Sequence, residues 1–493
     1  MTKPRLRFAP SPTGFLHIGS LRTVLFSYLI AKNLKGEFIL RIEDTDEKRK
    51  VAGSEKKLLD ILDWIGIKFD EGAYVGGKYG PYIQSERNKI YKKYIQKLIE
   101  TGEAYYCFCS AERLQKTRED QQKKKIAPRY DRRCRELSKE EINKKLKAGE
   151  KFVIRQKMPI NGDIIVKDEL RGKIIFKAKE LEDHVLIKSN GVPTYQFASV
   201  VDDHLMNITH VTRAEEWIPS LPKNILLYKS FNWEPPKFIH YPVVLNKEGG
   251  KLSKRQGDVA VEDYRDKGYL PEALINFTAL LGWSPYGKNI TDNDSKNKNI
   301  EILSIDQLIK KFDYHKIGTS PAIFDIEKLD YFNGYYIRQT NLDKLVKLCL
   351  PFLYGLDNKK YSSEYIKQVI SLEQERLKKI SDIKDLTKFF FIDKLNYSVE
   401  LLLWKKMDKK EVKQNLEKIY ELLKKIPKEN WTNDSIEDCI ISYLKINELK
   451  VGNYLWPMRV ALSGQKASPG PFDIAEVLGK NKTLERIKNG INK

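Results

Sequence analysis

Short apolar strand patterns and amphipathic helix patterns alternate along the first half of the chain, and this alternation limits the fold more than any other feature. RLRFA at 5–9 and FILRI at 38–42 have the composition of buried strands. Helix patterns lie between and after them, at 18–33, 54–65 and 86–100. Parallel strands need crossover connections of this kind, which are right-handed. We therefore predict an α/β fold with a doubly wound, parallel-sheet domain of the Rossmann type.

The alternation stops between residues 105 and 190. This interval holds a lysine-rich helix pattern at 111–125, a capping box formed by Ser138 and Glu141, and short strand patterns. Helix and strand patterns then alternate again, at 193–205, 208–213, 218–230 and 238–245. We therefore predict an insertion that interrupts a nucleotide-binding fold.

Strand patterns fade beyond about residue 330, where lysine-rich amphipathic helix patterns such as 363–381 and 409–425 take over. An amphipathic helix buries its apolar face against other helices and leaves its charged face to solvent or to a partner. We therefore predict that the C-terminal half of the chain is all-α.

The turn after the first strand, APSPTGFLHIGS at 9–20, has the composition of a phosphate-binding corner. Its prolines and Gly14 predict a tight turn, and His17 and Gly19 fall at the start of the next helix. Free N–H groups and the helix dipole make a helix N-terminus favourable for phosphate. An ordinary turn with a capping histidine would show the same short pattern. No GxxxxGK[ST] sequence occurs in the chain, so a nucleotide would be held without a P-loop.

A second notable stretch is KLSKRQG at 251–257, which follows Gly249 and Gly250. Such a loop cannot pack a core, and most charge runs simply face solvent. Lysines beside a reacting phosphate group would instead stabilise the negative charge that develops there. The heptapeptide alone leaves both interpretations open.

The composition suits a polyanionic partner, because 89 lysine and arginine residues against 67 aspartate and glutamate residues give a formal net charge of +22. A lysine-biased proteome would give the same balance. The five cysteines, an odd number, speak against a disulfide framework and for a reducing compartment. The start, MTKPRLRFAP, has no apolar signal core, and no apolar run approaches membrane-spanning length. We expect a soluble, cytoplasmic protein with no membrane partner.

Taken together, the motifs resemble those of a known family. APSPTGFLHIGS is similar to the HIGH signature, and KLSKR to the KMSKS signature, of class I aminoacyl-tRNA synthetases. With RIEDTD (41–46), PTYQFASVVDDH (193–204), TRAEEW (212–217) and LWPMRVALSG (455–464), essentially the whole chain resembles the bacterial glutamyl-tRNA synthetases. The resemblance implies ATP-dependent ligation of L-glutamate to tRNA(Glu) through a glutamyl-adenylate, with release of AMP and pyrophosphate. It also implies that ATP acts with Mg²⁺ and that the enzyme is a monomer.

The resemblance implies which residues bind ATP and assist its reaction. Lysines of the second signature would close over the phosphates while negative charge builds on the departing pyrophosphate, with Lys254 leading and Lys251 assisting. The catalytic set is His17, Gly19, Lys251 and Lys254. The ATP-binding set is Pro10, Ser11, Thr13, Gly14, His17, Gly19, Ser20, Lys251, Leu252, Ser253, Lys254 and Arg255.

The resemblance also implies a glutamate site, since an anionic side chain suits the rigid fork of arginine. Glu43 would hold the substrate ammonium group, and Ala9 would contribute backbone. The matching positions are Arg7, Ala9, Ser11, Glu43, Tyr195 and Arg213. Taken singly, each arginine fits a surface ion pair equally well. Aminoacyl transfer needs no carboxylate dyad, so the neighbouring Asp202 and Asp203 are expected to cap or to pack.

Three cysteines are candidates for a metal site. Cys107 and Cys109 form a Cys-x-Cys pair, and Cys134 follows later in the chain. Some members of the family carry Cys-x-Cys…Cys-x-His, and Glu136 stands here where the histidine would be. One structural zinc bound by these four residues is one interpretation, because thiolates favour zinc and structural sites take four ligands. Three small buried residues without a metal are the other.

Carried over to the whole chain, the resemblance predicts six segments. They are a catalytic domain in two halves at 1–104 and 191–247, an inserted acceptor-binding domain at 105–190, a KMSKS-like loop and stem-contact domain at 248–330, and helical anticodon-binding domains at 331–390 and 391–493.

Several alternatives lie close to this function. A glutaminyl-tRNA synthetase typically has a motif like PPEPNG where this chain has APSPTG, and its anticodon domains are β-barrels. A shorter paralogue that glutamylates queuosine in tRNA lacks the helical C-terminal half. A tRNA-binding protein without catalysis would not need the catalytic set. Charging of tRNA(Gln) as well as tRNA(Glu) depends on a few anticodon contacts, which one sequence does not reveal.

Overall fold

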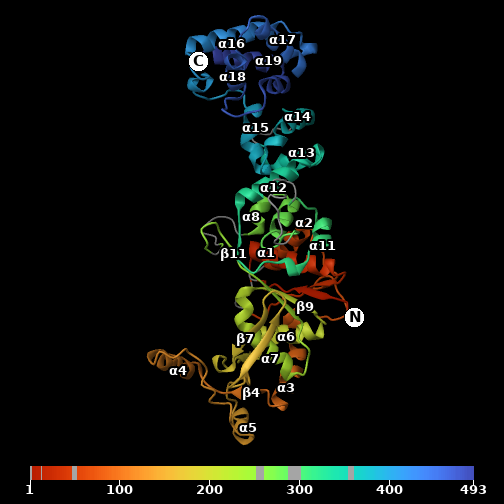
Figure 1. Ribbon diagram of the computed structural model, residues 1–493, viewed down its shortest axis with the longest axis vertical. Helices are drawn as coiled ribbons and strands as arrows, with labels where there is room; N and C mark the ends of the chain where they lie inside the picture. The colour runs from red at the N-terminus through yellow and green to blue at the C-terminus, as the bar shows by residue number, and fades with distance from the viewer. Residues whose placement is uncertain are drawn as a thin grey trace. The chain divides into compact units, whose positions relative to one another are not determined.

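The computed structural model describes residues 3–12, 14–46, 51, 53–250, 252, 260–286, 301–353 and 360–493. The chain forms two compact units (Figure 1). The first unit comprises Met1–Tyr264 and Leu274–Ile326, and the second comprises Arg265–Ala273 and Glu327–Lys493. Residues 265–273 thus interrupt the first unit in sequence but belong to the second.

Parallel strands form the centre of the first unit. They are, in chain order, β1 (Arg5–Phe8), β2 (Glu37–Leu40), β3 (Glu71–Gly72), β9 (His210–Ala214) and β10 (Lys237–Tyr241). β1 pairs with β2 and β2 with β3, while β9 pairs with β10. The backbone N–H of Thr209, just before β9, donates to the carbonyl of Arg5 at 2.9 Å, so β1 and β9 lie side by side.

Helices cover these strands, as the alternating sequence pattern predicts. They are α1 (Ile18–Asn33), α2 (Ser54–Ile65), α3 (Asn88–Glu100), α6 (Tyr195–Leu205) and α7 (Leu221–Ser230). α1 packs on β1, β2 and β9, and its buried residues include Leu21, Leu25 and Leu29. The predicted α/β fold with a doubly wound parallel sheet is confirmed.

The interval that interrupts the alternation forms two further pieces of sheet. Its elements are β4 (Ala104–Cys107), α4 (Ala111–Lys123), α5 (Lys139–Lys147), β5 (Val153–Gln156), β6 (Asp163–Asp168), β7 (Gly172–Lys177) and β8 (Val185–Ile187). β4, β5 and β8 pair antiparallel, and β6 and β7 form a hairpin. β6 also pairs in parallel with β10, where Asp168 lies opposite Phe238. The hairpin therefore extends the central sheet.

The strand predicted at 238–245 is divided in two. Pro242 has no N–H for a strand ladder, and the N–H of Val243 donates instead to Oε1 of Glu215 at 3.0 Å. After this break the chain forms a second, short strand, which pairs with a different partner from that of β10. The remaining elements near this point are β11 (Val244–Leu245), α8 (Val261–Asp266), α9 (Pro271–Ala279), α11 (Ile305–Lys311) and β12 (Ala322–Ile323), and β11 pairs with β12.

The second unit is built from helices, which confirms the predicted all-α C-terminal half. They are α12 (Ile326–Arg338), α13 (Leu342–Cys349), α14 (Ser363–Glu373), α15 (Ile383–Phe391), α16 (Lys409–Lys424), α17 (Asn433–Ile446), α18 (Val451–Ser463) and α19 (Pro471–Ile491). α19 packs against α16, α17 and α18, as the blue end of the ribbon in Figure 1 shows. Among the helices in the described ranges, none combines the length and the apolar composition needed to cross a membrane.

One predicted helix is shorter than its sequence pattern. The apolar spacing predicts a helix at 363–381, but α14 ends at Glu373 and a short 3₁₀ turn follows. The side-chain amide of Gln374 donates to the carbonyls of Ile337 at 3.0 Å and Thr340 at 2.8 Å, at the end of α12. Contacts with a distant segment thus end a helix that the local periodicity would continue.

Candidate active site

His17 caps the helix that follows the first turn. α1 begins at Ile18, and Nδ1 of His17 accepts the N–H of Gly19 at 2.9 Å. Because Nδ1 accepts, the ring hydrogen of the neutral imidazole is on Nε2. Burial lowers the pKa of His17, and a hydrogen bond with the backbone of Leu252 opposes part of this shift. The side chain is therefore a neutral donor at the N-terminus of α1.

The ends of the second signature lie beside the first. Besides the contact between His17 and Leu252, His17 forms a β-bridge with Ala260. The N–H of Val261 donates to the carbonyl of Leu16 at 2.9 Å. The structure therefore brings residue 252 and residues 260–261 to the helix N-terminus. Lys251, Ser253, Lys254 and Arg255 of the predicted ATP site, and Thr13 of the first turn, lie outside the described residues.

The first turn depends on two glycines. Gly14 has φ of +147°, a conformation that favours glycine. A Cβ on Gly19 would lie 3.3 Å from Nδ1 of His17 and would press on the histidine cap. The other predicted residues of the turn, Ala9, Pro10, Ser11 and Ser20, are all at least partly exposed. The carbonyl of Pro10 accepts the N–H of Glu43 at 2.9 Å, which connects this turn to the predicted amino-acid site.

The structure brings Arg7, Glu43, Tyr195 and Arg213 together at the carboxyl ends of the strands. Arg7 is in β1, Glu43 follows β2, Tyr195 begins α6 and Arg213 is in β9. Burial raises the pKa of Tyr195, the positive charges of Arg213 and Arg7 lower it, and the negative charge of Glu43 raises it. All four side chains are thus within electrostatic reach of one another, although they come from four separate elements.

Internal carboxylates already neutralise Arg7 and its neighbours. Nε of Arg7 lies 3.0 Å from Oδ1 of Asp203, and Nη1 of Arg41 lies 2.7 Å from the same oxygen. Nε of Arg87 lies 2.7 Å from Oδ1 of Asp202. Asp202 and Asp203 are therefore packed into a buried ion network, and their place in the fold is structural, as the sequence predicts.

Arg213 keeps an unpaired charge, and Glu43, although it is paired with Arg41, keeps one carboxylate oxygen without a hydrogen bond. Arg213 is only 6% exposed and makes no ion pair or hydrogen bond among the described residues. Its guanidinium carbon lies 5.4 Å and 5.7 Å from the ring centres of Tyr195 and Trp217. Oε1 of Glu43 accepts from Arg41 at 2.8 Å, whereas its Oε2 has no hydrogen bond within the described ranges. A buried charge without a partner is costly, so such an arrangement marks a place where a ligand supplies the partner.

A cavity of about 780 Å³ lies elsewhere, at the amino ends of the strands. Its lining includes Arg5 and Glu71, whose Nη2 and Oε2 atoms are 3.1 Å apart. Arg5 also donates to Glu37. The main charges of this cavity are therefore paired within the protein. The unpaired cation, Arg213, and the free oxygen of Glu43 are at the carboxyl edge, where open parallel sheets bind their ligands.

Comparisons with known proteins agree with this geometry. A family model described as tRNA synthetases class I (E and Q), catalytic domain, matches residues 3–331, and one described as an anticodon binding domain matches residues 344–491. The glutamate–tRNA ligase of Clostridium tetani is 47% identical over 494 aligned positions, which cover 100% of this chain and 98% of the relative. That of Clostridium acetobutylicum is 45% identical, over 99% of this chain and 98% of its own.

A solved structure is similar over the whole chain. The crystal structure of a glutamate–tRNA ligase from Elizabethkingia meningosepticum, in complex with its amino acid, is 37% identical with a TM-score of 0.89, and the match covers 100% of both chains. The chain belongs to the glutamate–tRNA ligase family of class I tRNA synthetases.

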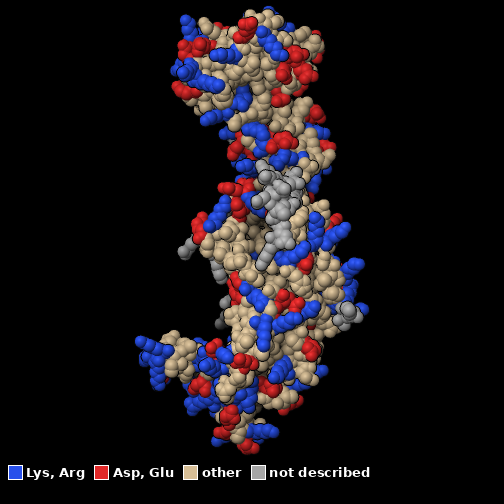
Figure 2. Space-filling view, in the orientation of Figure 1, with Lys and Arg blue, Asp and Glu red and all other residues tan. Residues whose placement is uncertain are grey.

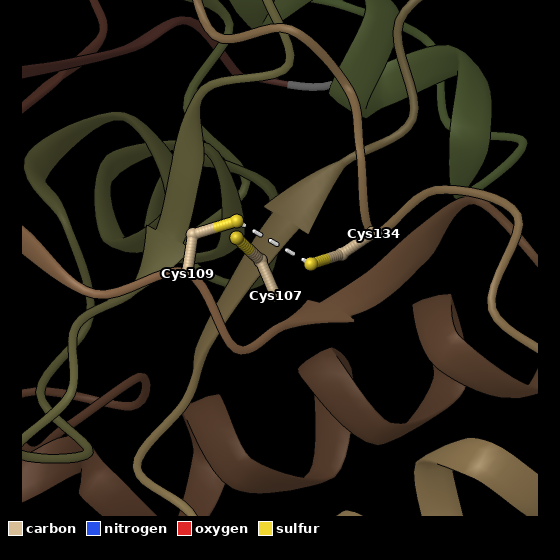
Figure 3. A group of neighbouring side chains, drawn as sticks. All are labelled: Cys107, Cys109 and Cys134. Carbon is tan, nitrogen blue, oxygen red and sulfur yellow. Dashed lines mark hydrogen bonds between the residues drawn. The ribbon is translucent and has the colours of Figure 1, made fainter. Parts of the chain in front are cut away.

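This glutamate–tRNA ligase family member has a cluster of thiols in its inserted segment. The sulfur atoms of Cys107, Cys109 and Cys134 all lie within 4.8 Å of one another and point toward a common centre (Figure 3). Sγ of Cys109 and Sγ of Cys134 are 3.5 Å apart. Sulfurs around a tetrahedral zinc, with Zn–S bonds of about 2.3 Å, are roughly 3.8 Å apart. The three thiols therefore fit a zinc ion.

Glu136 does not join these thiols, which corrects the expected fourth position. Its side chain is 82% exposed and its nearest ion-pair partner is Nε of Arg135 at 3.7 Å. Oη of Tyr130 lies instead 3.3 Å from Sγ of Cys107 and 3.7 Å from Sγ of Cys109. The same oxygen accepts the N–H of Cys134 at 3.1 Å. Tyr130 thus occupies the fourth side of the cluster.

Sequence reasoning missed the contacts that three residues make in these sites. Trp217 was part of the TRAEEW motif, but only the structure places its ring against Arg213. For Asp203 the sequence predicts a capping or packing role, and only the structure shows that it holds Arg7, which is 196 positions away in the chain. Tyr130 precedes Cys134 by four residues, and only this closeness to a cysteine could have drawn attention to it.

Proposed function

We propose that the enzyme joins L-glutamate to tRNA(Glu) in an ATP-dependent reaction that passes through glutamyl-adenylate and releases AMP and pyrophosphate. The observation that carries the substrate choice is the buried guanidinium of Arg213, which has no anionic partner among the described residues. An arginine fork pairs with a carboxylate through two parallel hydrogen bonds. Glutamine in the same place would leave this cation unneutralised, so the site favours glutamate over glutamine.

The other charged groups of the site suit the rest of the amino acid. Oε2 of Glu43 can accept the substrate ammonium group, because Arg41 occupies only Oε1. Arg7 uses Nε and Nη2 on Asp203 and keeps Nη1 for the substrate. Ser11 and the backbone of Ala9 lie on the turn beside them. A zwitterion with a second carboxylate is the ligand whose charges match these groups.

ATP would lie at the N-terminus of α1. The free N–H groups there are donors for phosphate oxygens. The Nε2 hydrogen of His17 would join them by exchanging the backbone of Leu252 for a phosphate oxygen. Lys251 and Lys254 would stabilise the charge on pyrophosphate as it leaves, and bound Mg²⁺ would neutralise the phosphates. Pro10, Thr13, Gly14, Gly19, Ser20, Leu252, Ser253 and Arg255 complete the proposed ATP site. The position of residues 252 and 260–261 beside His17 supports this arrangement.

Charging assays with labelled amino acids test the function. Purified enzyme with ATP and Mg²⁺ is given labelled glutamate or labelled glutamine, and either tRNA(Glu) or tRNA(Gln). We expect labelled tRNA(Glu) with glutamate and none with glutamine. Charging with glutamine would reject the substrate assignment. Glutamate on tRNA(Gln) would show a non-discriminating enzyme.

Two parts of the chain supply surfaces for tRNA. The second unit contains the segment that matches an anticodon binding domain. In the inserted segment, α4 buries no residue, and its exposed cations include Lys116, Arg118 and Lys123. Figure 2 shows Lys and Arg side chains gathered where Figure 1 places α4. We propose that the insertion at 105–190 binds the acceptor end and that residues beyond 330 read the anticodon.

Replacing Lys116, Arg118 and Lys123 with glutamine is expected to weaken tRNA binding. Each lost phosphate contact should lower the slope of log affinity against log salt by about 1. The KM values for glutamate and ATP should stay the same, because α4 contributes no residue to the glutamate or ATP site. A matched control replaces the exposed Lys89, Lys92 and Lys93 of α3. Equal losses in both triple variants would show a general charge effect and not a binding surface.

We propose that Cys107, Cys109, Cys134 and Tyr130 hold one structural zinc. The metal would join the end of β4 to the segment around Cys134 and so fix the fold of the insertion. Arg155 supports the tyrosine, since its guanidinium carbon lies 3.8 Å from the ring centre of Tyr130. Three thiolates and a phenolic oxygen would complete a four-coordinate site without Glu136.

Elemental analysis should find about one zinc per chain in protein purified without chelators. Tyr130→Phe is expected to lose zinc to a chelator at lower concentration than the wild type, and Cys109→Ser should lose it altogether. Glu136→Ala is the matched control and should behave like the wild type. Zinc below a tenth of one equivalent in the wild type would indicate a packed cysteine cluster without metal.

A further inference from the structure

The Arg213 side chain raises a question that the glutamate site alone does not answer. A buried arginine in a substrate site must be correctly aimed when the substrate carboxylate binds. Arg7 is held by the carboxylate of Asp203, which also neutralises it. Arg213 has no such carboxylate, and its Nε is buried without any hydrogen-bond partner among the described residues.

A second buried atom without a partner lies on the neighbouring strand. His240 in β10 is in register with Arg213 in β9. Register partners in parallel strands carry their side chains on the same face of the sheet. The His240 side chain is 0% exposed, and its Nε2 has no hydrogen bond in the part of the chain that the structure describes. An unpaired donor, Nε–H of Arg213, and an unpaired ring nitrogen are therefore neighbours.

The contact with Asp168 determines whether Nε2 of His240 is a hydrogen-bond donor or an acceptor. Oδ2 of Asp168 lies 2.8 Å from Nδ1 of His240, and both side chains are fully buried. A carboxylate only accepts, so Nδ1 carries the hydrogen and Nε2 of the neutral ring keeps a lone pair. Burial lowers the pKa of His240, the hydrogen bond and the negative charge of Asp168 raise it, and the positive charges of Arg213 and Arg171 lower it. The net shift is downward, which favours the neutral ring at neutral pH. The dyad therefore presents a neutral acceptor on the face that carries Arg213.

We propose that His240 is a positioning residue for glutamate recognition: when the substrate carboxylate binds, Nε2 of His240 accepts the Nε–H of Arg213. Both Nη groups of Arg213 are then left for the carboxylate. A neutral acceptor can aim the guanidinium without neutralising it, which a carboxylate in the same place could not do. Hydrogen bonds of this kind are often long in a free enzyme and shorten when substrate binds. This inference rests on the proposed glutamate site.

Asp168 connects the amino-acid site to the inserted segment. It belongs to β6, whereas His240 and Arg213 belong to the strands of the catalytic fold. The same turn of the insertion also contributes Arg171, which pairs with Glu215 two residues after Arg213. The amino-acid site is thus positioned in part by the segment proposed to carry the acceptor end of tRNA.

Two substitutions of His240 test the roles of its two ring nitrogens separately. The amide of asparagine reaches about as far as Nδ1 and keeps the contact with Asp168, while that of glutamine reaches the position of Nε2. We expect His240→Asn to raise the KM for glutamate by about tenfold, the effect of one hydrogen bond to a charged group. The kcat and the KM for ATP should change by less than about threefold, because a role in positioning Arg213 affects glutamate binding alone. His240→Gln should recover most of the affinity.

A double-mutant cycle with Arg213→Lys excludes a general packing effect. Lysine has no Nε–H, so adding His240→Asn to Arg213→Lys should raise the KM for glutamate no further. Thermal midpoints of all variants show whether the fold is kept. The proposal is overturned if His240→Asn keeps the wild-type KM, or if its effect is undiminished in the Arg213→Lys background. Either result, in an enzyme whose wild type charges tRNA(Glu) with glutamate, leaves the proposed function intact.

Discussion

Arg213→Gln is expected to raise the KM for glutamate by about a hundredfold, equivalent to about 3 kcal/mol. The reason is that Arg213 is a buried cation of the amino-acid site with no anionic partner among the described residues, so its removal leaves the substrate carboxylate without a cation to pair with. The KM for ATP should change by less than about twofold, since Arg213 lies at the end of β9 and not at the N-terminus of α1. Steady-state charging with each substrate varied in turn measures both values.

Arg213→Lys is the matched comparison. It keeps the positive charge but loses the fork that pairs with both carboxylate oxygens, so we expect an intermediate KM for glutamate. The fold should survive both changes, because Arg213 makes no ion pair or hydrogen bond with the described protein that its loss would break. An unaltered KM in Arg213→Gln would move glutamate recognition to another group, with Arg7 as the first alternative.

Lys254→Ala is expected to slow adenylate formation by about a hundredfold, because the loss of one donor that acts on the transition state typically costs about 3 kcal/mol. ATP affinity should change far less than the rate, since the lysine acts on charge that develops as pyrophosphate leaves. Single-turnover measurement of glutamyl-adenylate formation, in the presence of tRNA, separates the two effects.

Lys247→Ala is a suitable control for this experiment. Lys247 is another cation of the same connection, but its Nζ lies 3.1 Å from Oδ1 of Asp325 and so already has a partner. We expect this variant to form adenylate at close to the wild-type rate. Wild-type speed in Lys254→Ala would assign the pyrophosphate contact to another cation of the KLSKR motif.

Local patterns in the sequence determined most of the architecture. The apolar spacing of α1 and the turn before it follow from short-range chemistry, and α1 spans Ile18–Asn33 as predicted. His17 is the N-cap through a contact with Gly19, which is only two residues away in the sequence. The same holds for the amphipathic helices of the C-terminal half, such as α16. These features depend on residues within a few positions of one another, which periodicity and capping rules describe well.

Pairing between distant residues was decided only by the tertiary structure. The sequence offers Arg7 and Arg213 as equal candidates for the substrate carboxylate, but Asp203 neutralises Arg7 and no described residue neutralises Arg213. In the sequence Glu136 lies close to Cys134, but in the structure it is Tyr130 whose side chain contacts the thiols. Which charge stays unpaired and which atom completes a cluster depend on side chains that meet across the fold. Such contacts are set by the packing of whole elements, and no local pattern encodes them.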